Sequence, residues 1–352
     1  MTWKSSAVTK LQAAVVVIII IIALIIGVYY ATFLGPAPTT VSEFEIVGIT
    51  FGVRGDMGWG DANYESMQKF VQENPKIKGI VWKEGISYSE LEDILRSYLA
   101  DPKYPVIVGF GYEFGEVGLK IMPEYPNKIL LANSGPLTEE PPPNMGVNVY
   151  DQGEAGFLMG ALASYMTKTK KIGMVGGSPG SSTCEFLYGA MQAAYMIDQS
   201  IEVKYIMTGE WGNPSAGRDA ADSLIAAGCD VIIHYADGTG LGAMLRAKER
   251  GVYACGGFYS GSATVGDNIL GAFVNDFYLP WKGMIKDYCE GKWNGPYVVH
   301  GTIASGFIDW LPGPACPSNV KALVDSLREK IRSGEIIVQE IPYIIQPPYP
   351  WE

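Results

Sequence analysis

Two stretches of the chain, PVIVGFG at residues 105–111 and KILLANSG at residues 128–135, are continuous apolar runs that end in glycine and polar residues. Short apolar runs of this length are typical of parallel strands buried on both faces of a sheet. Upstream of the first run, Leu91, Leu95 and Tyr98 recur at the spacing of one helix face. The alternation of strand and helix predicts an α/β fold with a parallel sheet.

The same alternation continues outward in both directions. Upstream, FEIVGITFGV and KGIVW predict two more strands, and downstream, KIGMVGG opens a second series of the same kind. Helices are expected at 64–73, 89–99, 154–167, 183–197, 215–227, 240–250 and 317–333, and further strands at 203–207, 230–235, 253–257, 268–274 and 335–341. Two successive β/α halves predict two doubly wound parallel-sheet lobes joined by a hinge.

The chain has three stretches where it can pass between such lobes, near 147–151, 272–276 and 305–309. We therefore expect two discontinuous lobes. Lobe 1 is expected to comprise residues 44–150 and 276–307, and lobe 2 residues 151–275 and 308–345.

An uncharged segment, residues 13–34, precedes the folded region. It would span roughly 33 Å as a helix, enough to cross a bilayer. Lys4 and Lys10 precede it, so the positive-inside rule places residues 1–12 in the cytoplasm and the rest, after a Pro/Thr linker at 35–43, outside the cell. We expect one retained transmembrane helix at the cell membrane. A cleaved secretory signal and a pilin-like leader are the alternatives, whereas a lipoprotein is excluded because the first cysteine is Cys184.

Composition excludes several function classes. The 26 Lys and Arg against 37 Asp and Glu give a net charge of −11, which argues against nucleic-acid partners. Apolar residues make up 48% of the chain, which excludes global disorder. The two histidines and five cysteines form no clustered pattern, so neither a metal site nor a cofactor is expected. No Ser/His/Asp order or nucleophile elbow is present, so we expect no catalytic residue and no enzyme.

Ligands of doubly wound sheets bind beyond the carboxyl ends of the strands, which directs attention to the loops that follow them. The loop at 54–61 contains three glycines, Asp56 and Trp59, and Trp211 occupies a mirrored loop of the second half. Two such tryptophans could sandwich a planar ring, with each stack contributing roughly 1–3 kcal/mol. Ordinary interface packing is the alternative.

Other loops of this kind supply aromatic and polar side chains. Asp237 follows an apolar strand and would either accept a ligand N–H or cap the next helix, and Asp61 is expected to be a helix cap. His234 is expected to be a core residue, since it lies inside an apolar strand. The expected ligand-binding residues are Trp59, Trp211, Asp237, Asn133, Phe110, Tyr112, Asp56 and Phe258.

Four stretches resemble the basic-membrane-protein family of ABC-transporter substrate-binding proteins: GDMGWGDANYESM at 55–67, GEAGFLMGALASYMTKTKKIGMVGG at 153–177, EWGNPSAGRDAADSLIAAGCDVIIHYADGTG at 210–240 and GKW at 291–293. The resemblance covers most of 45–340. It implies a periplasmic-binding-protein type I fold that captures a purine nucleoside or base for delivery to an ABC permease. It also implies stacking at Trp59 and Trp211 and polar contacts near Asn133 and Asp237.

The chain departs from the nucleoside-binding branch of that family at two positions. An acidic residue is usual where this chain has Phe258, and a lysine where it has Asn275; both typically hold ribose hydroxyls. The resemblance therefore implies a small-molecule ligand that is a purine base or a nucleoside. The alternatives are a binding protein for a sugar or other small solute, a surface filament subunit that reuses the fold, and a nucleoside hydrolase, whose aspartate-rich motif is absent.

Overall fold

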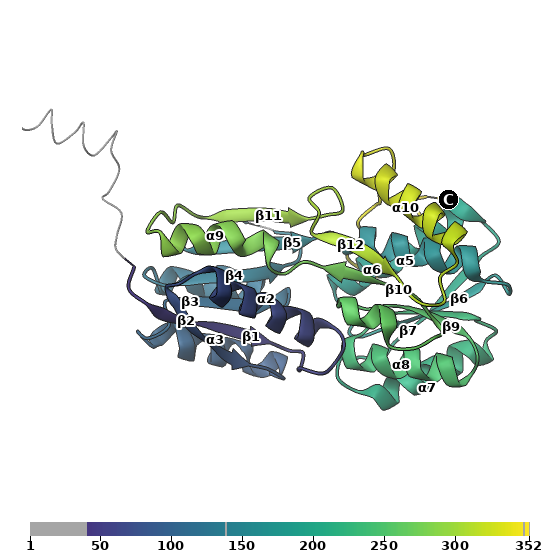
Figure 1. Ribbon diagram of the computed structural model, residues 1–352, viewed down its shortest axis with the longest axis horizontal. Coiled ribbons are helices and arrows are strands. Elements are labelled where there is room, and N and C mark those ends of the chain that lie inside the picture. The colour runs from purple at the N-terminus through teal and green to yellow at the C-terminus, as the bar shows by residue number, and fades with distance from the viewer. Residues whose placement is uncertain (1–40, 138, 348, 352) are drawn as a thin grey trace, which may run out of the picture.

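The computed structural model describes residues 41–137, 139–347 and 349–351 (Figure 1). The expected cytoplasmic segment 1–12 and transmembrane helix 13–34 lie outside the described residues, as does most of the linker at 35–43. Among the helices of the described part, none combines the length and apolar character needed to span a bilayer.

One six-stranded parallel sheet forms the core of lobe 1, in the order β11-β5-β4-β3-β1-β2. Its strands are β1 (Phe44–Thr50), β2 (Ile77–Lys83), β3 (Val106–Phe110), β4 (Ile129–Ser134), β5 (Met145–Tyr150) and β11 (Tyr297–Gly301). Its helices are α2 (Trp59–Glu73), α3 (Leu91–Ala100), α4 (Glu113–Ile121) and α9 (Leu279–Cys289), with short 3-10 turns at Tyr88–Glu90 and Met122–Glu124. The apolar runs that predict parallel strands became β3 and β4, and both are fully buried.

The second six-stranded sheet forms the core of lobe 2, in the order β12-β10-β9-β8-β6-β7. Its strands are β6 (Lys171–Gly176), β7 (Glu202–Met207), β8 (Val231–Tyr235), β9 (Tyr253–Gly256), β10 (Ile269–Asn275) and β12 (Ile308–Pro312), and β12 pairs antiparallel to β10. Its helices are α5 (Gln152–Met166), α6 (Ser181–Ile197), α7 (Pro214–Ala226), α8 (Asp237–Glu249) and α10 (Ser318–Arg332), with a 3-10 turn at Ser260–Thr264. The prediction of two parallel-sheet lobes is confirmed.

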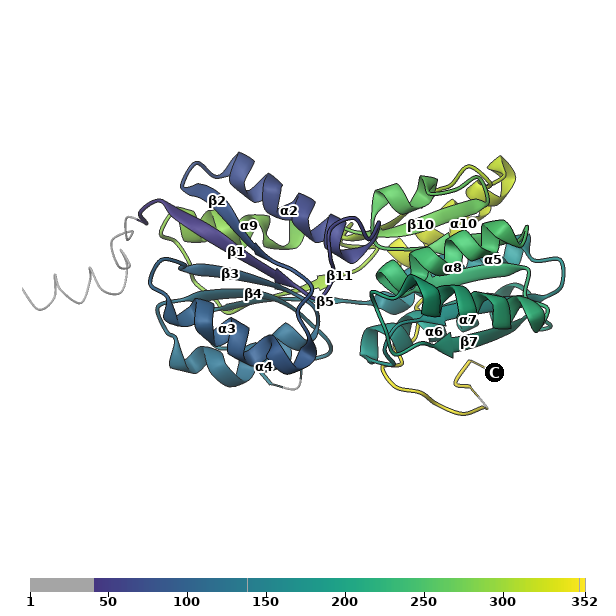
Figure 2. The same ribbon diagram turned by 90° about the horizontal axis from the view of Figure 1, so that it is seen from below.

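The lobes lie side by side, and the chain crosses between their sheets after β5, after β10 and after β11 (Figure 2). Helix α5 starts directly after the first crossing and is buried around most of its circumference. It packs against α6 through glycine: a Cβ at Gly156 would lie 2.0 Å from the Phe186 carbonyl oxygen. This close packing fixes the starts of α5 and α6 next to the crossings, where the lobes meet.

Two local predictions are wrong. The expected strand at 335–341 is a segment without strand structure, in which Val338 and Ile341 are buried while the Gln339 backbone bonds to the side chain of Gln192. Its alternating pattern reflects packing on lobe 2 rather than pairing in a sheet. Helix α2 begins at Trp59, before the expected residue 64, because Asp56 binds the backbone N–H groups of its first turn.

Candidate functional site

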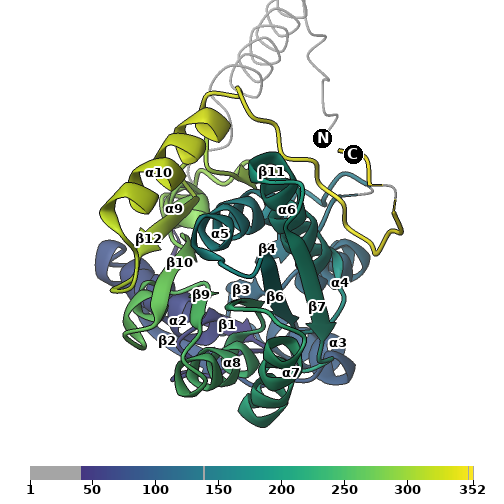
Figure 3. The ribbon, with the colours of Figure 1, turned by 90° about the vertical axis from the view of Figure 1, so that its right-hand side faces the viewer.

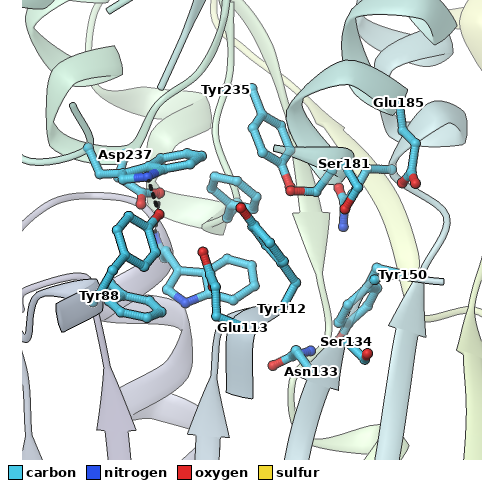
Figure 4. Close-up of a pocket in the computed structure, with 18 residues that line it drawn as sticks. Tyr88, Tyr112, Glu113, Asn133, Ser134, Tyr150, Ser181, Glu185, Tyr235 and Asp237 are labelled. Atoms are coloured by element: carbon cyan, nitrogen blue, oxygen red, sulfur yellow. Dashed lines mark hydrogen bonds between the residues drawn. The ribbon is translucent and has the colours of Figure 1, made fainter. Parts of the chain in front are cut away.

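A cavity lies between the lobes, beyond the carboxyl ends of strands from both sheets (Figure 4). Its empty space is about 630 Å³, part of it open to solvent. Six of the eight expected ligand-binding residues line it: Trp59, Trp211, Asp237, Asn133, Tyr112 and Phe258. The remaining two, Phe110 and Asp56, do not.

The aromatic side chains that line the cavity form its aromatic wall: Phe51, Trp59, Tyr88, Tyr112, Tyr150, Trp211, Tyr235 and Phe258. Trp59 is the first residue of α2. Its indole N–H donates to the Phe110 carbonyl oxygen at 3.3 Å. Its ring packs edge-on against Phe258, with centroids 5.1 Å apart, and against Phe277 at 4.7 Å. The hydrogen bond and the two ring contacts hold the indole in one orientation. Phe110 itself is fully buried, so it acts on the cavity only by positioning Trp59.

Trp211 contributes to the wall from lobe 2. Its indole N–H donates to the Tyr88 hydroxyl of lobe 1 at 2.9 Å (Figure 4). Its ring lies against Gly177, where a Cβ would be 2.6 Å from the ring, and 6.1 Å from the ring of Tyr235. The glycine is therefore required for this close approach. Tyr112 also crosses towards lobe 2, because its hydroxyl lies against Gly180.

Asp56 is occupied by the loop that leads into α2. Its carboxylate accepts the backbone N–H groups of Gly58 and Gly60, both at 2.8 Å. The neighbouring Asp61 accepts from Gly55 at 2.8 Å and Met57 at 2.9 Å, upstream of the helix, so the expectation that Asp61 is a helix cap is wrong. Both aspartates thus shape the loop that presents Trp59.

Asp237 is the first residue of α8, and its backbone has a φ of 44°. Its Oδ1 accepts the backbone N–H of Trp59 across the lobe interface at 3.3 Å, whereas no side-chain cap on its own helix is formed. Burial, together with the charge of Asp56, raises the pKa of Asp237 well above its ordinary value. Asp237 is thus a buried carboxyl group that joins the lobes at the cavity.

Amide groups without partners line another part of the cavity. Asn133, at the end of β4, and Gln152, at the start of α5, are 3% and 2% exposed. Neither polar atom of the Asn133 amide has a protein partner, nor has the Oε1 of Gln152. A buried polar atom without a partner costs roughly 1–3 kcal/mol, so these groups are suited to hydrogen bonds with a ligand.

The cavity also contains carboxyl groups but, within the described residues, no lysine or arginine among its lining side chains. Burial raises the pKa of both Glu113 and Glu185 to about 7. Arg54, the cation of the nearby loop, points elsewhere: it pairs with Glu84 at 3.1 Å and lies over the ring of Tyr64. The electrostatics of the cavity favour neutral or positively charged ligands over anions.

Phe258 separates this cavity from a second one. It is 2% exposed and lines both spaces, and the second space measures about 550 Å³. Asn275 lines only the second cavity, and neither polar atom of its side-chain amide has a protein partner. Of the two positions that depart from the nucleoside-binding pattern, Phe258 therefore forms an aromatic partition between the two cavities. Asn275 lies on the far side of that partition.

His234 and the cysteines take no part in the cavity. His234 is buried and packs against Gly240, and burial lowers its pKa to about 4. All five cysteines are free thiols, and the described residues contain no group of three or more side chains arranged to hold a metal ion.

Sequence reasoning missed Tyr88, Glu113, Gln152 and Glu185 as lining residues. Glu113 lies shortly after β3, in one of the loops selected by the rule that ligands bind beyond the carboxyl ends of strands. Gln152 is the first residue of α5 and Glu185 lies in the second turn of α6. The available signal was the rule that helices following parallel strands point their N-termini at the ligand.

Comparison with known proteins places the chain among binding proteins. The family described as "ABC transporter substrate-binding protein PnrA-like" matches residues 45–341. Basic membrane protein A2 of Borrelia garinii subsp. bavariensis is 28% identical over 82% of this chain and 86% of its own length. A purine-binding protein of Brucella abortus is 24% identical over 89% of this chain and 88% of its own length.

Two further similarities concern ligand class and fold. A putative ABC transporter glucose-binding protein of Haloferax volcanii is 25% identical over 81% of this chain and 71% of its own length. A crystal structure of an ABC-transporter solute-binding protein from Aeropyrum pernix K1 superimposes with a TM-score of 0.73 at 19% identity, covering 85% of this chain and 94% of that one. The latter similarity shows the fold.

Proposed function

Since the chain belongs to the Bmp family of ABC-transporter substrate-binding proteins, we propose that it captures a purine base or nucleoside between its lobes and delivers it to a permease. Members of this family bind substrates for transporters and are not enzymes. One observation carries the proposal: an aromatic wall with Trp59 and Trp211 shares a cavity with the unpartnered amide of Asn133. A purine offers both a flat π-face and an edge of hydrogen-bond donors and acceptors.

The aromatic partition favours the free base over the nucleoside. Phe258 packs edge-on against Trp59 and against Tyr235, with centroids 5.1 Å and 4.6 Å apart, so the ring is held from both lobes. A ribose directed towards Asn275 would have to displace this buried ring. We therefore propose that bases bind more tightly than their nucleosides.

The charges of the cavity oppose nucleotides. Glu113, Glu185 and Asp237 contribute carboxyl groups, and the described lining contains no cationic side chain. A phosphate would enter this space without a compensating charge, which is costly in a partly desolvated site. AMP should therefore bind far more weakly than adenine.

A sugar is the second candidate, because one relative is named as a putative glucose-binding protein. Aromatic walls and amide side chains also suit sugar rings. A thermal-shift panel of purines, nucleosides, sugars and amino acids on residues 43–352 separates the two proposals. A shift with glucose and none with any purine would favour the sugar.

We also propose that the folded region faces the cell exterior on a membrane anchor formed by residues 13–34. The support is the length of the apolar segment and the lysines that precede it. Protease added to intact cells should remove the region after residue 43, and complete protection would refute this topology.

A further inference from the structure

The N-terminus of α5 is capped by two glutamates from distant parts of the chain. Glu185 of α6 accepts the backbone N–H of Gln152. Glu340, from the segment that follows α10, accepts the backbone N–H of Gly153 at 3.3 Å. Asp151, the residue before the helix, makes no side-chain cap. Figure 3 shows this C-terminal segment running along α6.

Glu340 is packed tightly into this position. A Cβ at Gly153 would lie 2.6 Å from one of its carboxyl oxygens, so a larger residue at this position would force the Glu340 carboxyl group to shift. Gln192 anchors the adjacent backbone through two hydrogen bonds of 2.9 Å to Gln339, and the Tyr188 hydroxyl bonds the Ile345 backbone further on. The C-terminal segment is therefore built to deliver a carboxyl group to the start of α5.

Glu185 connects this cap to the ligand cavity. It is 5% exposed and lines the cavity (Figure 4), as Gln152 also does. The Oε1 of Gln152 is buried, lines the same cavity and has no protein partner, which independently indicates a ligand contact here. A ligand in the cavity can thus reach both side chains.

The surroundings of the pair are acidic. Asp151 and Glu154 lie close by, and among the described residues no lysine or arginine forms an ion pair with any of the four carboxyl groups. Burial raises the pKa of Glu185 to about 7 and that of Glu340 to about 9, with Asp151 adding to both shifts and Glu185 adding to the second. The other titratable groups that face the cluster are His300 beside Asp151, and Tyr235 and Cys184 beside Glu185.

We propose that Glu185 meets the ligand as a neutral carboxylic acid that donates a hydrogen bond, and that Glu340 is a positioning residue that caps the same helix while holding a proton of its own. The inference rests on the proposed function, because it assigns a role within the same cavity. Its consequence is that ligand capture consumes a proton when Glu185 is ionised in the empty protein, so affinity falls as the pH rises.

The test is calorimetric titration of adenine into residues 43–352 between about pH 6 and about pH 8.5. The wild-type Kd should rise about tenfold per pH unit above 7. Glu185→Gln, which keeps an N–H donor, should bind with a Kd that changes little with pH. Glu340→Gln exchanges a carboxyl group that is protonated below about pH 9 for a neutral amide, so its Kd should follow the same pH dependence as that of wild type.

A ligand-free measurement separates the outcomes. Because the folded pKa of Glu340 is raised, wild type should lose stability relative to Glu340→Gln as the pH rises from the ordinary glutamate range towards 9. If wild type and Glu340→Gln have superimposable melting curves at every pH, Glu340 does not retain a proton, whether or not adenine binds. Adenine binding with a pH-independent Kd would refute the role of Glu185, whereas no purine binding at any pH would refute the proposed function instead.

Discussion

The indole N–H of Trp211 in lobe 2 donates a hydrogen bond of 2.9 Å to the hydroxyl of Tyr88 in lobe 1. Both residues line the cavity, so the bond joins the lobes at the site itself. Three further bonds join the same faces: Trp59 to Asp237, Ser262 to the Met57 carbonyl and Tyr259 to Glu65. The structure is therefore a closed arrangement in which protein–protein bonds hold the lobes together around the ligand space.

Removing the Tyr88 hydroxyl should weaken this closed arrangement. Tyr88→Phe keeps the ring and loses the bond, so ligand affinity should fall by roughly 0.5–1.5 kcal/mol, the usual net contribution of one hydrogen bond. Tyr98→Phe, on α3 outside the cavity, is the matched control. Equal Kd values for Tyr88→Phe and wild type would show that the bond makes no contribution to closure.

The two tryptophans should differ in how much they contribute to folding. Trp59→Ala and Trp211→Ala should each reduce purine affinity by roughly 1–3 kcal/mol. Only Trp59→Ala should also lower the melting temperature of the empty protein markedly, because Trp59 packs against Phe258 and Phe277 and bonds the Phe110 carbonyl.

Calorimetry and melting curves decide this, with Trp293→Ala as the control. Trp293 lies outside the cavity and bonds the Pro143 carbonyl. Unchanged affinity in both cavity variants would exclude a stacked ring.

Asp237→Asn should change the pH dependence of stability. The folded pKa of Asp237 is raised by burial, so its charged form is disfavoured in the native state and wild type loses stability as the pH rises through the native value. The neutral variant should therefore gain melting temperature relative to wild type between acidic and neutral pH. Asp267→Asn is the control, since Asp267 is exposed and its pKa is lowered by Lys248. A constant difference across pH would contradict the burial argument.

Phe258→Leu should relax the preference for free bases. The smaller side chain thins the partition between the two cavities, so adenosine should gain affinity relative to adenine. Phe273→Leu is the control, because Phe273 packs behind Phe258 at 4.9 Å and lines neither cavity. If both variants keep the wild-type ratio of the two Kd values, the partition does not set ligand size.

The fold was largely predictable from local pattern. Strands that are buried on both faces of a parallel sheet must be apolar on both faces, so β3 and β4 are recognisable in the sequence as continuous apolar runs. The rule that ligands bind beyond the carboxyl ends of strands then selected the loops that contribute most of the aromatic wall. Strands β11 and β12 lack such runs, and the sequence pattern did not single them out.

The parts that escaped prediction depend on long-range contacts. Glu340 is separated from Gly153 by almost two hundred residues, and nothing in its neighbourhood indicates that it caps α5. The roles of Asp56 and Asp61 follow from the turn between them, in which Met57 adopts a φ of 53°. Such backbone geometry decides which carboxylate meets the helix, and composition alone does not specify it.

The most direct test of the central claim is isothermal titration of adenine, adenosine, AMP and glucose into the purified region 43–352. We expect adenine to bind most tightly, adenosine more weakly, and AMP and glucose not measurably, because the cavity combines an aromatic wall, unpartnered amides and carboxyl groups without a cation among the described lining residues. Tight binding of glucose or AMP, with no heat from either purine base or nucleoside, would contradict the account.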